Sequence, residues 1–112
     1  MNIDPILLSV YARTFKAITD EMSISMQQTT RSPILCEAKD FVTGLYDADG
    51  RMLEQTENLP ILAFSLAPVC KHVRSKFGDD IAPGDVFFHN DVFSLGNQNN
   101  DVAVFKPVFW EG

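Results

Sequence analysis

The sequence of 112 residues lacks the local motifs that mark several enzyme classes. It contains no Gly-rich phosphate loop, no nucleophile elbow and no H-E-x-x-H motif, so no nucleotide site or hydrolytic centre is evident from a single motif. The two cysteines, Cys36 and Cys70, form no C-x-x-C pair, which argues against a disulfide framework or a cysteine zinc site. Both are predicted to be small core or boundary residues. No apolar run approaches the roughly 20 residues that span a bilayer.

Positive charge is also scarce. Nine Lys and Arg residues against 15 Asp and Glu residues give a formal net charge of −6. The basic residues are scattered, which argues against a nucleic-acid partner. With no signal-peptide pattern and no paired cysteines, the expected compartment is the cytoplasm. An apolar content of 46% and a charged content of 21% predict a folded chain of one domain.

The first 30 residues predict a long helix. Asp4 can accept hydrogen bonds from the free N–H groups of the first turn, and Pro5 suits the first helical position. Polar residues 27–32 and then Pro33 are predicted to end the helix. Apolar residues at spacings of three and four form one stripe, made of Leu7, Tyr11, Phe15, Ile18, Met22 and Met26. Ordinary helix packing is the favoured role of this stripe.

A β-hairpin and a second helix are predicted next. Residues 41–46 and 51–55 are expected to be strands joined by a turn at 47–50, and the apolar residues 60–64 to be a strand or buried loop. The helix is predicted to begin at Ser65 and to stop at Gly78. Its expected inward residues are Leu66, Val69, Cys70, Val73 and Phe77. By contrast, His72 has basic neighbours and is assigned to the solvated face.

Two more strands complete an α+β pattern. A turn at 83–85 leads into the apolar residues 86–88, predicted to be a fully buried strand, and residues 102–109 predict another. The expected fold is a long N-terminal helix, a hairpin, a second helix and further strands within a larger mixed-sheet domain. Because the final apolar strand has no following partner, residues 1–112 are expected to be an N-terminal portion that is incomplete on its own.

The segment 88–101, between the last two predicted strands, carries the most polar chemistry. Its carboxylate and amide oxygens suit hard cations such as Mg²⁺ or Mn²⁺, and they can also orient a carbonyl substrate. Asn, Asp and Gly are equally the usual residues of ordinary loops. The residues alone therefore leave both interpretations open. His89, just before the loop, is interpreted as structural rather than as a ligand.

An ordered set of short motifs resembles the B-type subunits of ATP-dependent hydantoinases, 5-oxoprolinase, and the acetone and acetophenone carboxylases. The similarity covers essentially the whole chain. The matching pieces are Asp4-Pro5-Ile6, Ser32-Pro33, Glu37-Ala38-Lys39-Asp40-Phe41, Leu45-Tyr46-Asp47-Ala48-Asp49-Gly50, Pro83-Gly84-Asp85-Val86-Phe87, Asn90-Asp91 and Pro107-Val108-Phe109. No single piece is specific, but their order is.

This resemblance implies a two-subunit enzyme. An A-type subunit would bind ATP and phosphorylate an amide or enolate oxygen, and the B-type subunit would then hydrolyse the activated cyclic amide or carboxylate the activated ketone. This chain would bind no ATP itself. The resemblance places metal ligands at Asp40 and Asp101 and catalytic residues at Asp91 and Gln98. The residues expected to line a substrate pocket are Leu62, Phe64, Asn90 and Asn100.

The sequence departs from the commonest family pattern, N-D-P-x-x-G-G-x-H-x-x-D. Val92 replaces its proline, Leu95 its first glycine and Gln98 its histidine, while Leu62 stands in place of the histidine of an upstream P-x-H element. An amide oxygen is a weaker transition-metal ligand than imidazole, so any divalent metal is expected to be Mg²⁺ or Mn²⁺ rather than Zn²⁺.

These changes favour ketone carboxylation slightly over ring opening of hydantoin or 5-oxoproline. The ending at 109–112, which is similar to that of acetone carboxylase, points the same way. A non-catalytic assembly module is the second alternative. The expected partners are the A-type subunit, the remainder of the B-type subunit or another copy of it, and a small cyclic amide or ketone.

Overall fold

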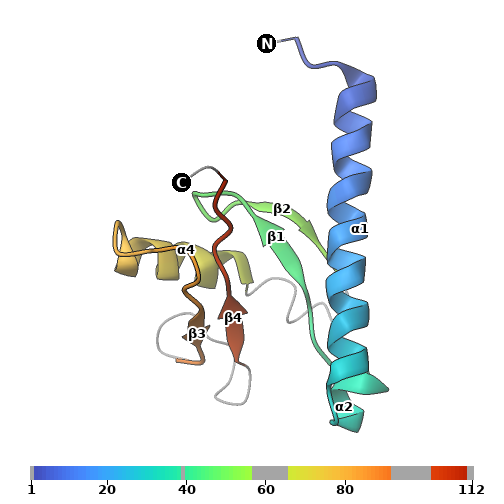
Figure 1. Cartoon of the computed structure of the whole chain (residues 1–112), viewed down its shortest axis with the longest axis vertical. Helices are drawn as coiled ribbons and strands as arrows, with labels where there is room; N and C mark the ends of the chain where they lie inside the picture. Colours follow the sequence, from blue (N-terminus) through green and yellow to red (C-terminus); the bar gives the residue numbers. More distant parts are fainter. Residues whose placement is uncertain (1, 39, 57–65, 92–101, 111–112) are drawn as a thin grey trace.

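The computed structural model describes residues 2–38, 40–56, 66–91 and 102–110. Figure 1 shows a long helix at one side and a second helix with short strands at the other, which confirms the predicted α+β class. The elements are α1 (Pro5–Thr29), α2 (Pro33–Cys36), β1 (Gly44–Tyr46), β2 (Met52–Gln55), α4 (Leu66–Phe77), β3 (Phe87–His89) and β4 (Ala103–Phe105). In the described part of the chain, the strands form two antiparallel pairs, β1–β2 and β3–β4. The larger mixed sheet stays a prediction.

Helix α1 begins as predicted. The Asp4 carboxylate accepts a hydrogen bond from the Ile6 N–H at 2.9 Å, and Pro5 takes the first helical position. The helix ends at Thr29, inside the predicted polar run, because Thr30 adopts an extended conformation. Its apolar stripe is half-exposed, with Tyr11 at 53% exposure. The chain itself therefore covers this stripe only partly.

A cluster of threonines attaches the hairpin to α1. Thr19 is completely buried on α1, and its carbonyl oxygen accepts a hydrogen bond from the Thr43 hydroxyl at 2.9 Å. The Thr43 and Thr56 hydroxyls are 2.9 Å apart, and the Thr56 N–H donates to the Thr43 carbonyl at 2.8 Å. These bonds lie at the open end of the hairpin, so they fix its direction against the helix.

The turn at 47–50 has the chemistry that the sequence predicts. The Asp47 carboxylate accepts hydrogen bonds from the backbone N–H groups of Asp49 and Arg51, each at 2.9 Å, and Gly50 has a φ of 84°. Hydrogen bonding from the Arg51 N–H is the main cause that lowers the pKa of Asp47. The turn packs on α4, where the Arg74 guanidinium donates to the Ala48 carbonyl at 3.1 Å.

Gly50 is needed for this contact as well as for its backbone conformation. A Cβ at this position would lie 2.6 Å from Cγ of Lys71 and 3.1 Å from its Cα. At Gly84, which also has a positive φ of 91°, a Cβ would meet nothing within 4 Å. Helix α4 therefore lies close to Gly50, whereas no other element lies close to Gly84 among the described residues.

We expect Gly50→Ala to lower the free energy of unfolding by about 2–4 kcal/mol, because backbone strain and overpacking add. Gly84→Ala should cost about 1 kcal/mol from strain alone. Urea denaturation of the two variants measures both values. If the two variants lost the same free energy of unfolding, the close contact between the turn and α4 would not add to the cost of Gly50→Ala.

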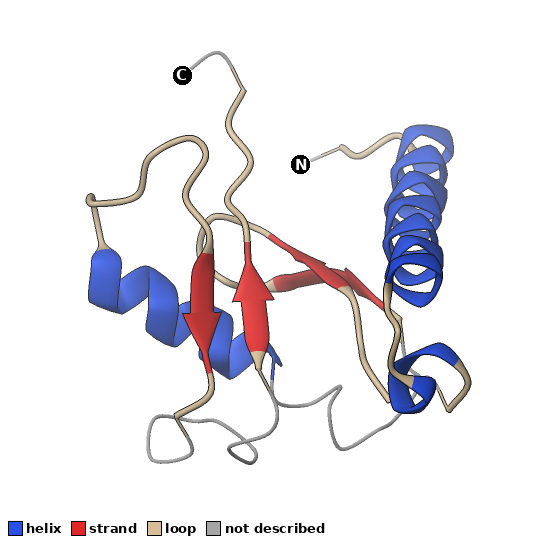
Figure 2. Cartoon of the chain, turned by 60° about the horizontal axis from the view of Figure 1, so that its bottom comes forward, coloured by secondary structure: helices blue, strands red, loops and turns tan. Residues whose placement is uncertain are grey.

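Strands β3 and β4 pair in register, with Phe87 opposite Phe105 and His89 opposite Ala103. Phe87 lies 4.7 Å from Phe77 of α4, and Phe105 lies 6.4 Å from Tyr46 of β1, measured between ring centroids. The prediction that residues 86–88 are fully buried is wrong, because Phe88 points to the other face and is 72% exposed. One face of this pair is thus covered and the other is open (Figure 2).

Helix α4 follows its prediction closely. Pro68 lies in its first turn, Val69 and Val73 are buried, and Gly78 follows the last residue with a φ of 53°. The expected inward position of Phe77 is only partly confirmed, because its side chain is 38% exposed. Within the described ranges, no helix is long and apolar enough to cross a membrane.

Candidate functional site

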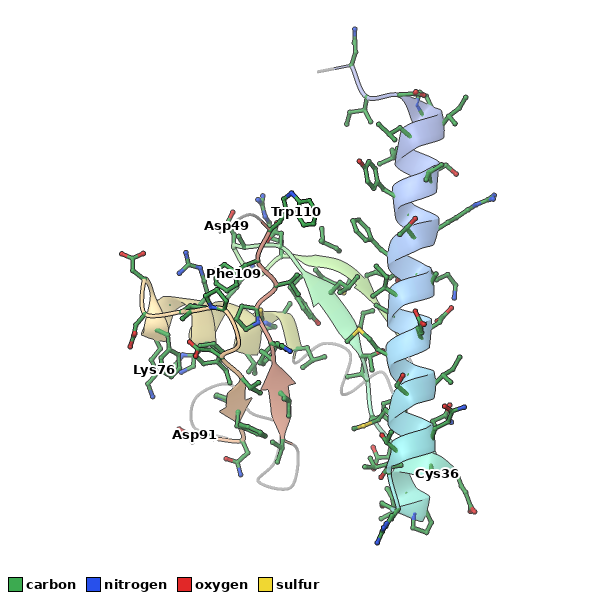
Figure 3. All side chains as sticks on the ribbon, in the orientation of Figure 1. Cys36, Asp49, Lys76, Asp91, Phe109 and Trp110 are labelled. Carbon is green, nitrogen blue, oxygen red and sulfur yellow. The ribbon has the colours of Figure 1, made fainter. Side chains whose placement is uncertain are left out.

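The predicted polar segment leaves from the end of β3 and returns at β4. Because His89 is opposite Ala103, the strand pair holds both ends of this segment close together, which the sequence did not predict. Asn90 and Asp91 are exposed and follow β3 directly. Figure 3 places Asp91 at the end of the strand pair opposite to Asp49, Phe109 and Trp110. The prediction of a strand on each side of the segment is therefore confirmed.

Asp40, the other predicted site residue that the structure describes, is reached through an element that the sequence did not predict. Its backbone N–H donates to the Ile34 carbonyl at 3.1 Å, so the short helix α2 fixes its position. Its carboxylate is exposed, while the adjacent Phe41 is buried. In Figure 3, Cys36, at the end of α2, and Asp91 both lie near the bottom of the view. Cys36 is beside α1, and Asp91 is below β3 on the other side.

The remaining predicted site residues lie outside the described residues: Leu62, Phe64, Gln98, Asn100 and Asp101. Among the residues that are described, no group of three or more His, Cys, Asp or Glu side chains could hold a metal ion. Asp40 and Asp91 therefore do not assemble a metal centre by themselves. The metal role of Asp40 with Asp101 stays a prediction.

A groove of about 790 Å³, which the sequence did not predict, lies between the hairpin, α4 and the segment after β4, with Met22 of α1 at its edge. The Tyr46 hydroxyl in its wall donates to Gln55 Oε1 at 2.7 Å, and burial raises the pKa of Tyr46 to about 12. Burial also raises the pKa of the Cys70 thiol. Both groups are neutral near pH 7, so neither is a ready nucleophile or base. The charged residues Asp47, Arg74, Asp79 and Lys106 also line the groove.

The described residues of the polar segment, 88–91, do not line the groove. Phe105–Phe109 and the turn at 47–50 line the groove, whereas Asp91 is at the other end of the strand pair. Sequence reasoning missed the groove because its lining comes from five helices and strands, α1, β1, α4, β3 and β4. Its aromatic lining residues, Tyr46, Phe87, Phe105 and Phe109, are spread along the sequence and form no local motif.

The structure also corrects the interpretation of His72 as a solvated residue. Its side chain is half-buried, and its ring centroid lies 5.6 Å from that of His89, with 74° between the planes. The two rings come from α4 and β3. They meet beside the point where the polar segment begins.

Comparison with known proteins assigns this arrangement to a family. The model of the family described as hydantoinase B/oxoprolinase matches residues 4–112. The chain is 37% identical over 111 residues to the caprolactamase subunit beta of Pseudomonas jessenii, covering 99% of this chain and 19% of that protein. It is 29% identical to the 5-oxoprolinase PfmaA of Pestalotiopsis fici, covering 99% of this chain and 9% of the relative.

A third relative is the 5-oxoprolinase of Saccharomyces cerevisiae, 29% identical over 110 residues, with 97% of this chain and 8% of the relative covered. No solved structure matches the chain. The chain thus spans a fifth or less of the length of these relatives. The family match extends over nearly every residue, and the chain belongs to the hydantoinase B/oxoprolinase family.

Proposed function

We propose that this chain is the N-terminal part of a B-type subunit in an ATP-dependent enzyme that opens a cyclic amide. The observation that carries this proposal is the 37% identity to a caprolactamase subunit beta over essentially the whole chain. Caprolactam and 5-oxoproline, which the names of the relatives specify, are both lactams. This shared chemistry favours lactam hydrolysis over the ketone carboxylation that the sequence slightly favoured.

The reaction would be divided between two subunits. An amide is a poor electrophile, and phosphorylation of its oxygen by an ATP-binding A-type partner would make its carbon open to attack by water. On this chain, Asp91 would accept the proton of the attacking water, and Gln98 would orient the activated amide by hydrogen bonds. Collapse of the tetrahedral adduct would break the ring C–N bond, and the nitrogen would leave as an amine after taking up a proton. A second water would hydrolyse the acyl phosphate that remains, which releases the carboxylate and inorganic phosphate. Asn90 and Asn100 would line the polar side of the pocket, and Leu62 and Phe64 its apolar side.

The donor set expected for a metal consists of the carboxylates of Asp40 and Asp101, which would suit Mg²⁺ or Mn²⁺. The described residues alone do not complete such a site, so we assign no step of the reaction to a metal.

Exposed apolar side chains on α1 and after β4 support the proposal that this chain is part of a larger subunit. The first turns of α1 are apolar on several sides, with Ile6 at 76% exposure, and Val108 after β4 is 92% exposed. A helix that is apolar around its circumference is normally buried. Because the related caprolactamase subunit is about five times longer than the matched region, we propose that further parts of the B-type subunit cover these residues.

The test is ATP turnover in a purified complex of the B-type subunit with its A-type partner. We expect caprolactam or 5-oxoproline to raise ATP hydrolysis at least about tenfold, with release of the ring-opened amino acid. Stimulation only by acetone or acetophenone with bicarbonate would instead establish the carboxylase. If a stable complex forms and neither lactam nor ketone stimulates ATP hydrolysis, the chain belongs to a non-catalytic assembly module.

A further inference from the structure

The fold brings together the only two histidines of the sequence. His72 and His89 are 17 residues apart (89 − 72) and lie on α4 and β3. Their ring centroids are 5.6 Å apart, with 74° between the ring planes. Neither residue belongs to the family motifs that the sequence matches, so the pair is not explained by the proposed reaction.

This separation suits two imidazoles that share a metal ion. With Zn–N bonds of about 2.0–2.1 Å and tetrahedral angles, two ligating rings have centroids roughly 5 Å apart. A shift of a few tenths of an ångström in each ring would bring His72 and His89 to that separation. Side chains on a helix and on a paired strand are held by rigid elements, which favours a defined pair of ligands.

A second observation concerns the ring nitrogen of His89. Its Nε2 is buried, and among the described residues it has no hydrogen-bond partner. A buried polar atom without a partner costs free energy, and such atoms in native proteins commonly mark a site for water, an ion or chemistry. A metal ion bound to this nitrogen would remove that cost.

From this geometry we propose that His72 and His89 form a site for a divalent transition-metal ion such as Zn²⁺. Imidazole nitrogen selects Zn²⁺, Ni²⁺ or Cu²⁺, whereas carboxylate and amide oxygens select Mg²⁺ or Mn²⁺. The nitrogen ligands of this site therefore differ in metal preference from the oxygen ligands predicted at Asp40 and Asp101. Water would fill the other coordination positions, so the expected dissociation constant is on the order of 10 µM, well above that of a four-ligand structural zinc site.

The competing explanation is an aromatic contact without a ligand. Two rings at this distance and angle also make a favourable edge-to-face pair. The substitution His72→Phe separates the two explanations, because phenylalanine keeps a ring at this position but has no nitrogen. His89→Gln removes the other ring, and Asp80→Asn, at an exposed aspartate after α4, is a control that leaves both histidines.

The experiment titrates Zn²⁺ into the whole B-type subunit that contains this chain, produced without a polyhistidine tag, and follows the calorimetric heat. We expect one Zn²⁺ site that depends on both histidines. His72→Phe and His89→Gln should each weaken binding at that site at least about tenfold, and Asp80→Asn should leave it unchanged. Circular dichroism verifies the fold of each variant.

If His89→Gln does not fold, His72→Phe decides the question. Zn²⁺ binding by His72→Phe with the affinity of the unmodified protein would overturn the proposal, as would no response to about 1 mM Zn²⁺, a hundredfold above the expected dissociation constant. Because the readout is binding, failure here leaves the proposed ATP-dependent reaction untouched.

Discussion

Phe41→Ala is expected to lower the free energy of unfolding by about 3–5 kcal/mol, more than truncation of either buried valine of α4. Phe41 is 6% exposed, and the other buried apolar side chains among the described residues are Val69 and Val73. A core of so few large side chains has little to compensate for the cavity. Small domains are stable by about 5–15 kcal/mol, so at the lower end of that range this loss would leave about 0–2 kcal/mol and a measurable unfolded fraction at 25 °C.

The matched control is Phe88→Ala, the same substitution at a side chain that is 72% exposed. It should change the free energy of unfolding by less than about 0.5 kcal/mol in the isolated chain. Thermal and urea denaturation of both variants give the comparison. Similar losses at the two positions would show that Phe88 is covered in solution, for example by a second copy of the chain.

Local chemistry explains which parts of the fold could be predicted. The start of α1 depends on Asp4 and Pro5, and the hairpin turn depends on Asp47 and Gly50, all within a few residues of the element they control. The end of α4 likewise follows from Gly78. Such signals are complete in a short stretch of sequence, and the structure confirms each of them.

Features that depend on distant contacts could not be predicted in the same way. The apolar run 86–88 is compatible with burial on both faces, but the covering of β3 by α4 on one face leaves Phe88 exposed. Likewise, the basic neighbours of His72 favoured a solvated face, and only the packing of α4 against β3 shows its contact with His89. Helix α2 was missed because four residues after Ser32 carry almost no periodic pattern.

In the candidate site, too, local features could be predicted from the sequence and features that depend on distant contacts could not. Sequence motifs located the polar segment and Asp40, and the β3–β4 register adds that the two ends of the segment are held together. Sequence alone could not show how the carboxylates lie relative to one another. Asp40 is held by α2 and Asp91 by β3, so their approach depends on packing between elements that are not adjacent in sequence.

We expect Asp91→Asn to reduce lactam-stimulated ATP turnover in the A-type and B-type complex by about 10²–10⁴-fold. Asparagine has nearly the same shape but cannot accept the proton of the attacking water, and general-base catalysis contributes a factor of this size. Asp91 is exposed at the end of β3, so the substitution should leave the fold and the assembly intact. Product release and ATP hydrolysis should be measured together, because phosphorylation by the partner precedes the step assigned to Asp91.

The matched control is Asp80→Asn, an exposed aspartate after α4, which should retain full turnover. If Asp91→Asn hydrolyses ATP and releases product at the rate of the unmodified complex, Asp91 is not the base. A third outcome, in which Asp91→Asn still hydrolyses ATP but no longer opens the ring, would identify the step that Asp91 serves. It would show that the partner still phosphorylates the lactam and that water attacks the phosphorus instead of the ring carbon. That side reaction releases inorganic phosphate and restores the lactam, which places Asp91 at the hydrolytic step.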